Sequence, residues 1–233
     1  MPDIPVIAID GPSGTGKGTV SGILATKLGW HLLDSGSLYR VLALTALNSG
    51  ISLNDTDKLV QLLTTLNLRF ESATEYSGAS IILNDQDVSE DIREESCGNA
   101  ASLVAALPEV RQTLLERQRK FRQAPGLVAD GRDMGTIVFP TAQLKIFLTA
   151  SAEERATRRY KQLIEKGINV NLRDLSADIA ERDRRDKERV ASPLRPAEDA
   201  VTIDTTGIKI QRVINRISAL VEERFGSQPG FTR

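Results

Sequence analysis

A glycine-rich segment near the N-terminus has the composition of a phosphate-binding loop. It reads Gly11-Pro12-Ser13-Gly14-Thr15-Gly16-Lys17-Gly18-Thr19 and lies between the apolar residues 4–9 and a stretch with helical periodicity. Glycines let consecutive backbone N–H groups converge on phosphate oxygens, and the N-terminus of the following helix favours the same anion. A lysine at the position of Lys17 reaches the β and γ phosphates of a nucleoside triphosphate. The apolar run before the loop and the helix after it favour this interpretation over a flexible turn.

Gly18 departs from the usual pattern of such a loop. A serine or threonine normally stands at this position and binds Mg²⁺ through its hydroxyl, whereas Thr19 comes one residue too late for that role. Mg²⁺ gives up its water reluctantly and accepts phosphate and carboxylate oxygens. We therefore expect the ion to be held by water, by phosphate or by a carboxylate elsewhere in the chain, and the sequence leaves its ligands open.

Two polar segments, each containing an arginine, follow the second and third apolar runs of the chain. Asp34-Ser35-Gly36-Ser37-Leu38-Tyr39-Arg40 follows residues 31–33, and Asp130-Gly131-Arg132-Asp133-Met134-Gly135-Thr136 follows residues 127–129. Each segment alone is also consistent with ordinary turn and capping chemistry. In an open parallel sheet, ligands bind beyond the carboxyl ends of the strands, so both segments are expected in the cleft of the phosphate loop. Arginine can bind phosphate through two parallel hydrogen bonds, and the two segments together predict a second phosphate site.

A charged segment later in the chain predicts an arginine-bearing lid over this cleft. Residues 153–195 contain twelve Lys or Arg against nine Asp or Glu, in a chain whose net charge is −1. Helical spacing places Arg182, Asp186 and Arg189 on one face and Arg184 on another. A solvent-exposed helix with many ion pairs would explain most of these charges equally well. Phosphoryl transfer needs cationic stabilisation and exclusion of water, and a lid that closes over both substrates provides both.

Short apolar or β-branched runs alternate with amphipathic helical patterns along the chain. Continuous apolar strands separated by helices indicate a parallel sheet that is covered on both faces. We therefore predict an α/β fold with a five-stranded parallel sheet and helices on both faces, together with an arginine-rich helical lid. Alternating segments between residues 66 and 91 predict a small antiparallel insertion, a hairpin or three-stranded ribbon attached to the main sheet. The expected strands are Ile4 to Ile9, His31 to Leu33, Leu127 to Ala129, Leu144 to Leu148 and Val201 to Ile203.

Composition excludes several classes of function. The chain has 233 residues and a pI near 6.0, so no overall charge favours nucleic acid or an anionic membrane. A single Cys97 excludes an internal disulfide, and a single His31 leaves no partner for a histidine relay, so we expect a partly buried cysteine and a packed strand histidine. No segment resembles a secretion signal or a membrane span. We expect a cytoplasmic monomer that acts on small molecules, without nucleic-acid or membrane partners.

The motifs together resemble those of bacterial cytidylate kinases, which belong to the P-loop nucleoside monophosphate kinases. The likeness covers nearly the whole chain, and Gly-Lys-Gly-Thr is the form of the phosphate loop seen in that class. It implies transfer of the γ-phosphoryl group of ATP to CMP or dCMP, with Mg²⁺. It also implies a kinase core of residues 1–65 and 92–233, a lid at about 153–195, and an insertion at 66–91 in the acceptor-binding region. The matching motifs lie at 11–19, 33–40, 129–136 and 181–186.

The resemblance assigns roles to individual residues. Residues 11–19 would bind ATP. Cytosine offers an amino donor and ring acceptors, and uracil inverts two of these groups, so the residues that read the base would select between them. By this likeness the acceptor phosphate is held by Ser35, Arg40 and Arg132, the cytosine edge by Ser102, Arg111 and Asp133, and the sugar by Arg182 and Asp186. The cationic side chains expected to act in catalysis are Lys17, Arg132, Arg158, Arg182 and Arg189.

The residues themselves also allow other functions. A different P-loop kinase would act on another monophosphate or on a hydroxyl-bearing metabolite, although two arginine-bearing turns favour an acceptor with a phosphate. A nucleotide-dependent switch would hold nucleotide in the same loop to control a partner, and it would lack multiple-turnover transfer. Single-strand nucleic-acid binding is disfavoured because no aromatic residue is interleaved with the basic residues 181–189.

Overall fold

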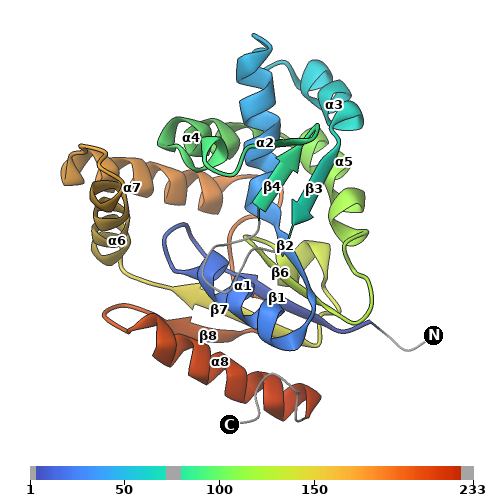
Figure 1. Ribbon diagram of the computed structural model, residues 1–233, viewed down its shortest axis with the longest axis vertical. Coiled ribbons are helices and arrows are strands. Elements are labelled where there is room, and N and C mark those ends of the chain that lie inside the picture. The colour runs from blue at the N-terminus through green and yellow to red at the C-terminus, as the bar shows by residue number, and fades with distance from the viewer. Residues whose placement is uncertain (1–3, 72–79, 227–233) are drawn as a thin grey trace.

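A parallel five-stranded sheet forms the centre of the molecule in the computed structural model, which describes residues 4–71 and 80–226 (Figure 1). The strand order is β2-β6-β1-β7-β8, and every neighbouring pair is parallel. The predicted sheet is confirmed, and each strand ends one or two residues later than the apolar run that indicated it. The strands are β1 (Val6–Asp10), β2 (His31–Asp34), β6 (Leu127–Gly131), β7 (Leu144–Thr149) and β8 (Val201–Asp204).

The two faces of the sheet support separate hydrophobic cores. Side chains alternate along β1, so that Val6 and Ala8 belong to one core and Ile7 and Ile9 to the other, all fully buried. Helices therefore cover both faces, as the sequence predicts. The first core is lined by α2 (Ser35–Asn48), α3 (Thr56–Thr65), α4 (Glu95–Val104) and α5 (Pro108–Arg119), and the second by α1 (Lys17–Leu28) and α8 (Ile210–Phe225).

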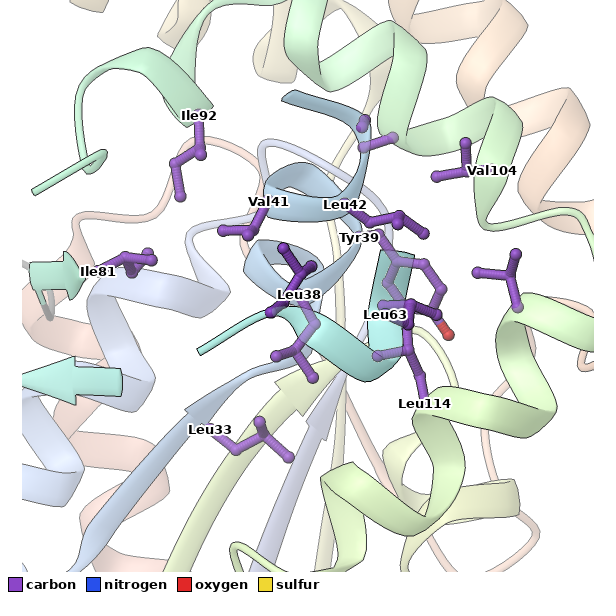
Figure 2. Packing of buried hydrophobic residues seen from close by; sticks show 14 of the residues in the cluster. Leu33, Leu38, Tyr39, Val41, Leu42, Leu63, Ile81, Ile92, Val104 and Leu114 are labelled. Carbon is purple, nitrogen blue, oxygen red and sulfur yellow. The ribbon is translucent and has the colours of Figure 1, made fainter. Parts of the chain in front are cut away.

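Helix α2 lies in the middle of the larger core, where Figure 2 shows Leu38, Val41 and Leu42 among side chains from neighbouring elements. The helix begins directly after β2 because Asp34 caps it. The Asp34 carboxylate accepts hydrogen bonds from the backbone N of Ser37 at 3.1 Å and from its Oγ at 2.5 Å. This cap holds the first turn of α2 at the carboxyl end of the sheet.

The insertion forms a small antiparallel sheet of its own, with strands in the order β3 (Leu68–Glu71), β4 (Ser80–Leu83) and β5 (Gln86–Asp87). The predicted three-stranded ribbon is confirmed, but its expected attachment to the main sheet is wrong within the described residues. Ile81 and Leu83 turn their side chains into the core around α2, so packing on helices replaces strand pairing. Residues 72–79 of the insertion lie outside the described residues.

A turn at Asn84 and Asp85 joins β4 to β5. Both residues have positive φ, 48° and 66°, which asparagine and aspartate tolerate in two-residue hairpin turns. Gln86 and Asp87 then pair with β4, so the turn consists of two residues.

Two consecutive helices, α6 (Ala152–Glu165) and α7 (Leu172–Glu188), project together from the sheet at the left of Figure 1. They pack against one another, and α7 also contacts α4. We call α6, α7 and the turn between them the α6–α7 hairpin. Two short helices complete the fold: η1 (Asp91–Arg93) and the π-helical turn η2 (Met134–Val138).

Cys97 and His31, the single cysteine and the single histidine of the chain, differ in exposure. Cys97 is only 2% exposed, which is deeper burial than the sequence predicts. His31 is exposed rather than packed, because it begins the outermost strand, and its Nε2 lies 2.9 Å from the carbonyl oxygen of Ala124. Across residues 4–71 and 80–226, every helix is too short or too polar to cross a membrane.

Candidate active site

The phosphate loop occupies the turn between β1 and α1, at the middle strand of the sheet. Two of its glycines are required by the backbone. Gly11 has φ +146°, and a Cβ there would lie 2.1 Å from the carbonyl oxygen of Leu148. Gly16, with φ +90°, is the cap residue directly before α1. A residue with a side chain would strain or displace the backbone at both positions.

Lys17 is the first residue of α1 and is only 6% exposed. Its Nζ donates to the carbonyl oxygen of Pro12 at 2.8 Å, which folds the side chain back over the loop. Burial, followed by the charge of Arg132, lowers the pKa of Lys17 to about 8. A phosphate group bound in the loop would add negative charge beside Lys17 and favour its protonated form.

Asp10 and Asp130 lie near the carboxyl ends of the neighbouring strands β1 and β6, where Asp130 pairs with Ile9 and Asp10 with Gly131. Asp10 accepts hydrogen bonds from the backbone N of Met134 and of Gly135, both at 2.8 Å, and so holds the turn that follows β6. Burial nevertheless raises the pKa of Asp10 to about 6. Asp10 was missed by the sequence analysis, because a carboxylate at the end of an apolar strand carries no motif.

Asp130 faces the unusual glycine of the phosphate loop. Its Oδ2 is buried without a hydrogen-bond partner in the described part of the chain. The same atom lies 3.7 Å from the position that a Cβ on Gly18 would occupy. Burial and the neighbouring Asp34 raise the pKa of Asp130 to about 8. The carboxylate therefore lies where the loop lacks its usual hydroxyl.

Arg132 connects the end of β6 to α7. Its Nε donates to Oδ2 of Asp186 at 2.9 Å. Burial alone would lower the pKa of Arg132, but Asp186 and Asp130 raise it. Conversely, burial would raise the pKa of Asp186, and Arg132 and Arg189 bring it below its usual value. Both side chains are thus charged at neutral pH.

The residues assigned to the base come from three elements: Arg111 from α5, Ser102 from α4 and Asp133 from the turn after β6. Arg111 forms a buried ion pair with Asp133, and its guanidinium lies 5.8 Å from the ring centroid of Tyr39. A second contact, from Nη1 of Arg111 to the carbonyl oxygen of Ala105 at 3.2 Å, fixes the side chain further. Nearby on α4, the Oγ of Ser102 is shielded from solvent and has no partner among the described residues.

Ser35 and Arg40 lie on α2, where the cap at Asp34 places them. The Oγ of Ser35 accepts from Nε2 of Gln118 at 3.2 Å, and Nη1 of Arg40 donates to the carbonyl oxygen of Ile92 at 2.6 Å. Burial, then Arg182 and Arg132, lower the pKa of Arg40 despite the opposing effect of Asp34. The positive charges of Arg182 and Arg132 thus repel the charge of Arg40.

Arg182 and Arg158 of the α6–α7 hairpin, and Arg189 directly after it, each contact a different part of the molecule. Arg182 donates to Oδ1 of Asn99 at 2.7 Å and to Oε2 of Glu95 at 3.0 Å. Arg189, just after α7, donates from Nε to the carbonyl oxygen of Ser192 at 2.5 Å, while its buried Nη2 has no partner within the described ranges.

Arg158 points elsewhere, toward the loop after β8. Its Nη1 donates to Oγ1 of Thr205 at 3.1 Å and its Nη2 to the carbonyl oxygen of that residue at 2.5 Å. The structure therefore brings Arg132 and Arg189 to Asp186, whereas Arg158 lies beside the loop after β8 and Arg182 is engaged by α4. The predicted faces of α7 are confirmed for Arg182 and Asp186, which are buried, and for Arg184, which is exposed, but Arg189 follows the last residue of the helix and does not share its helical face.

Several arginines at this edge of the sheet repel one another. Burial and neighbouring arginines lower the pKa of Arg189, Arg182 and Arg40 alike. Such mutual repulsion is stable only because other contacts hold the side chains in place, and it favours binding of anions. The phosphate loop and these arginines thus lie at the same edge of the sheet, on neighbouring elements.

A family model described as cytidylate kinase matches residues 7–223. The chain belongs to the cytidylate kinase family. A cytidylate kinase of Aeromonas hydrophila is 55% identical over 227 residues, which cover 97% of this chain and 98% of the relative. One of Stutzerimonas stutzeri is 57% identical over 221 residues, covering 95% and 96%. One of Nitrosococcus oceani is 58% identical over 215 residues, covering 92% and 95%.

The fold also resembles that of a crystal structure of an uncharacterized protein from Eubacterium ventriosum. The TM-score is 0.52 at 13% identity, over 94% of this chain and 99% of the other. At this identity the similarity concerns the fold alone. A surface hollow of about 630 Å³ is lined by Tyr160 of α6 and by residues 169–172 at the start of α7, at the opposite end of that helix from Asp186.

Proposed function

We propose that this chain transfers the γ-phosphoryl group of ATP to CMP or dCMP, forming ADP and CDP or dCDP. Family membership supports the reaction class. The observation that carries the choice of base is the buried Arg111–Asp133 pair, together with a Ser102 Oγ that has no partner among residues 4–71 and 80–226. These three side chains supply an acceptor and two donors on adjacent elements. That is the polar pattern complementary to the edge of cytosine.

ATP occupies the loop of residues 11–19 in this proposal. The backbone N–H groups and the N-terminus of α1 surround its phosphates. Lys17 exchanges the carbonyl oxygen of Pro12 for β and γ phosphate oxygens, because a charged acceptor makes the stronger hydrogen bond. Binding of phosphate also favours the protonated form of this lysine.

Mg²⁺ fits the carboxylate that faces Gly18. The Oδ2 of Asp130 is a buried oxygen without a partner among residues 4–71 and 80–226, and oxygen ligands are what this ion prefers. We infer that Asp130 holds Mg²⁺, directly or through water, in place of the missing hydroxyl. The ion, when bound, neutralises charge on the ATP phosphates. Asp130→Asn should weaken Mg²⁺ binding to the ATP complex at least tenfold in a calorimetric titration, and unchanged affinity would contradict this assignment.

The acceptor nucleotide lies between α2, β6 and the α6–α7 hairpin. We assign its phosphate to Ser35, Arg40 and Arg132, and its sugar to Arg182 and Asp186. Arg132 and Asp186 are already paired at 2.9 Å, so the acceptor meets a guanidinium whose position is fixed before binding. Every one of these residues comes from one chain, and we accordingly propose that a monomer is active.

Catalysis follows from position and charge. The acceptor phosphate oxygen is anionic near neutral pH, so no general base is needed. Lys17, Arg132 and Arg189 stabilise charge on the transferring group. The Nη2 of Arg189, which has no partner in the described part of the chain, is available for this role. Arg158 adds positive charge from its place beside Thr205.

We propose that residues 153–195 act as a lid that closes over both nucleotides and excludes water. The ion pairs from Arg159 and Arg182 to Glu95 of α4 support this, since they join the hairpin to the acceptor side of the core. The insertion of residues 66–91 then completes the acceptor region around the kinase core of residues 1–65 and 92–233. Since both substrates are soluble metabolites of the cytoplasm, we propose that location for the enzyme.

The test is ATP-dependent diphosphate formation with Mg²⁺, with CMP, dCMP, UMP, AMP, GMP and no acceptor compared side by side. The proposal expects product from CMP and dCMP, little from UMP, and almost none without acceptor. Asp133→Ala should reduce the preference for CMP over UMP in kcat/KM at least tenfold, because the amino group of cytosine loses its acceptor. Transfer to none of the monophosphates would point to a different acceptor or to a nucleotide switch.

A further inference from the structure

Arg155, in the first turn of α6, joins three parts of the molecule although it is only 3% exposed. Its Nε donates to the carbonyl oxygen of Ala150 at 3.1 Å, next to the end of β7. Its Nη1 donates to the carbonyl oxygen of Ser13 in the phosphate loop at 3.2 Å. Both terminal nitrogens also bind the carboxylate of Asp183 on α7, at 3.0 and 2.5 Å. The charge of this buried guanidinium is thus matched by one carboxylate from the other helix of the hairpin.

The contact with Ser13 fixes one peptide of the phosphate loop. In a trans peptide the C=O and N–H groups point in opposite directions, and the bond between Ser13 and Gly14 is trans. Because the oxygen of Ser13 points to Arg155, the N–H of Gly14 points away from it, across the loop. Gly14 itself has φ +79°, and a Cβ there would lie 3.0 Å from the Cβ of Arg155, so α6 and the loop are in close contact.

Asp183 also links this contact to the acceptor side. It lies three residues before Asp186 on α7, so the two carboxylates are near neighbours on the helix surface. Asp183 binds the guanidinium that holds the phosphate loop, and Asp186 binds Arg132 at the end of β6. One helix therefore contacts both nucleotide sites through two carboxylates that are less than one turn apart.

We propose that Arg155 is a positioning residue for phosphoryl transfer, and that Asp183 makes its action depend on the docked position of α7. With α7 docked, Arg155 holds the 13–14 peptide so that Gly14 N–H faces the donor phosphates. When α7 moves away from α6, Asp183 leaves Arg155, the guanidinium is no longer held on both sides, and the loop peptide is free to rotate. Docking of α7 on α6 thereby aligns the donor site. This inference rests on the proposed transfer reaction.

Two single substitutions separate the parts of this arrangement. Arg155→Lys keeps the charge but cannot reach Ala150, Ser13 and Asp183 together, since an ammonium lacks the planar fork of the guanidinium. Asp183→Asn keeps the shape of α7 and removes the anion. The matched control is Arg184→Gln, on the same helix, whose partners Glu181 and Glu188 are exposed and distant from the loop.

The measurements are the affinity for MgATP without acceptor, by titration calorimetry, and KM for each substrate. Both Arg155→Lys and Asp183→Asn should weaken MgATP binding at least tenfold and lower kcat, while KM for the acceptor changes less than threefold. The double variant should be no weaker than the worse single variant, because the two side chains act as a unit. Arg184→Gln should match the wild type in all of these.

Several outcomes would overturn the inference. A lower melting temperature with unchanged MgATP affinity in both variants would show that the ion pair only stabilises the fold. Additive losses in the double variant would show that the two residues act separately. If Arg155→Lys does not fold, Asp183→Asn decides the matter alone. Weaker MgATP binding by these variants in a protein that phosphorylates no monophosphate would support the inference and refute the proposed acceptor.

Discussion

Arg132 and Asp186 form an ion pair, with 2.9 Å between Nε and Oδ2, across the gap between the central sheet and the α6–α7 hairpin. Asp186→Asn should raise KM for the acceptor about tenfold to a hundredfold, equivalent to about 1.4 to 2.7 kcal/mol, because Arg132 loses the anion that orients it. The affinity for MgATP should change little. Steady-state kinetics with each substrate varied in turn checks this, and an equal rise in both KM values would contradict it.

Ser102→Ala should separate binding from stability. The Oγ of Ser102 has no hydrogen-bond partner within the described residues, so its removal should leave the free energy of unfolding within about 0.5 kcal/mol of wild type. Affinity for CMP should nevertheless fall, because the hydroxyl gains its partner only from the base. Denaturant unfolding and CMP titration on one preparation make the comparison. Unchanged CMP affinity would remove Ser102 from the acceptor site.

ATP binding should take up a proton above pH 8 through Lys17. Burial lowers the pKa of this lysine to about 8, and phosphate oxygens beside it raise that pKa again. The bound form thus prefers the protonated lysine, and affinity should fall as pH rises through the pKa of the free enzyme. Calorimetry at pH 8.5 in two buffers of different ionisation enthalpy measures the proton directly. Lys17→Arg keeps the charge at this pH and should abolish the uptake, whereas persistent uptake would assign it to another group.

Asp10 should make stability depend on pH with an unusual sign. Burial raises its pKa to about 6, so between about pH 4 and 6 the folded state holds a proton that the unfolded state has released. The contribution of Asp10 to the free energy of unfolding therefore decreases as pH rises through this window, by about 2–3 kcal/mol in total. The difference in free energy of unfolding between wild type and Asp10→Asn should follow this change. A difference that is constant from pH 4 to 7 would contradict it.

Sequence patterns were sufficient for the parts of the molecule that depend on local order. Parallel buried strands appear as continuous apolar runs, and the loop between Gly11 and Lys17 has a fixed relation to the strand and helix that flank it. The carboxyl ends of β2 and β6 could be placed beside that loop because parallel topology requires it. Helical spacing also correctly placed Arg182 and Asp186 on the same face of α7, although it did not predict that this face is buried.

Pairings between distant residues could not be predicted in this way. Arg155 and Asp183 are 28 positions apart, and in sequence they look like members of a solvated charged helix. Only the angle between α6 and α7 brings them together against Ser13. Asp10 likewise gains its role from the turn at Met134, which is 124 residues away. The separate position of the small sheet depends on packing of Ile81 and Leu83, which alternating patterns do not specify.

The two hydrophobic cores on opposite faces of the sheet divide the enzyme into halves that can change independently. Val6 and Ala8 anchor the helices that carry the acceptor residues, and Ile7 and Ile9 anchor the helices next to the phosphate loop. A substitution that changes packing on the first face can therefore affect packing on the second face only through the backbone of the sheet. New acceptor preferences could arise on this scaffold by repacking one side while the machinery that handles ATP is inherited unchanged.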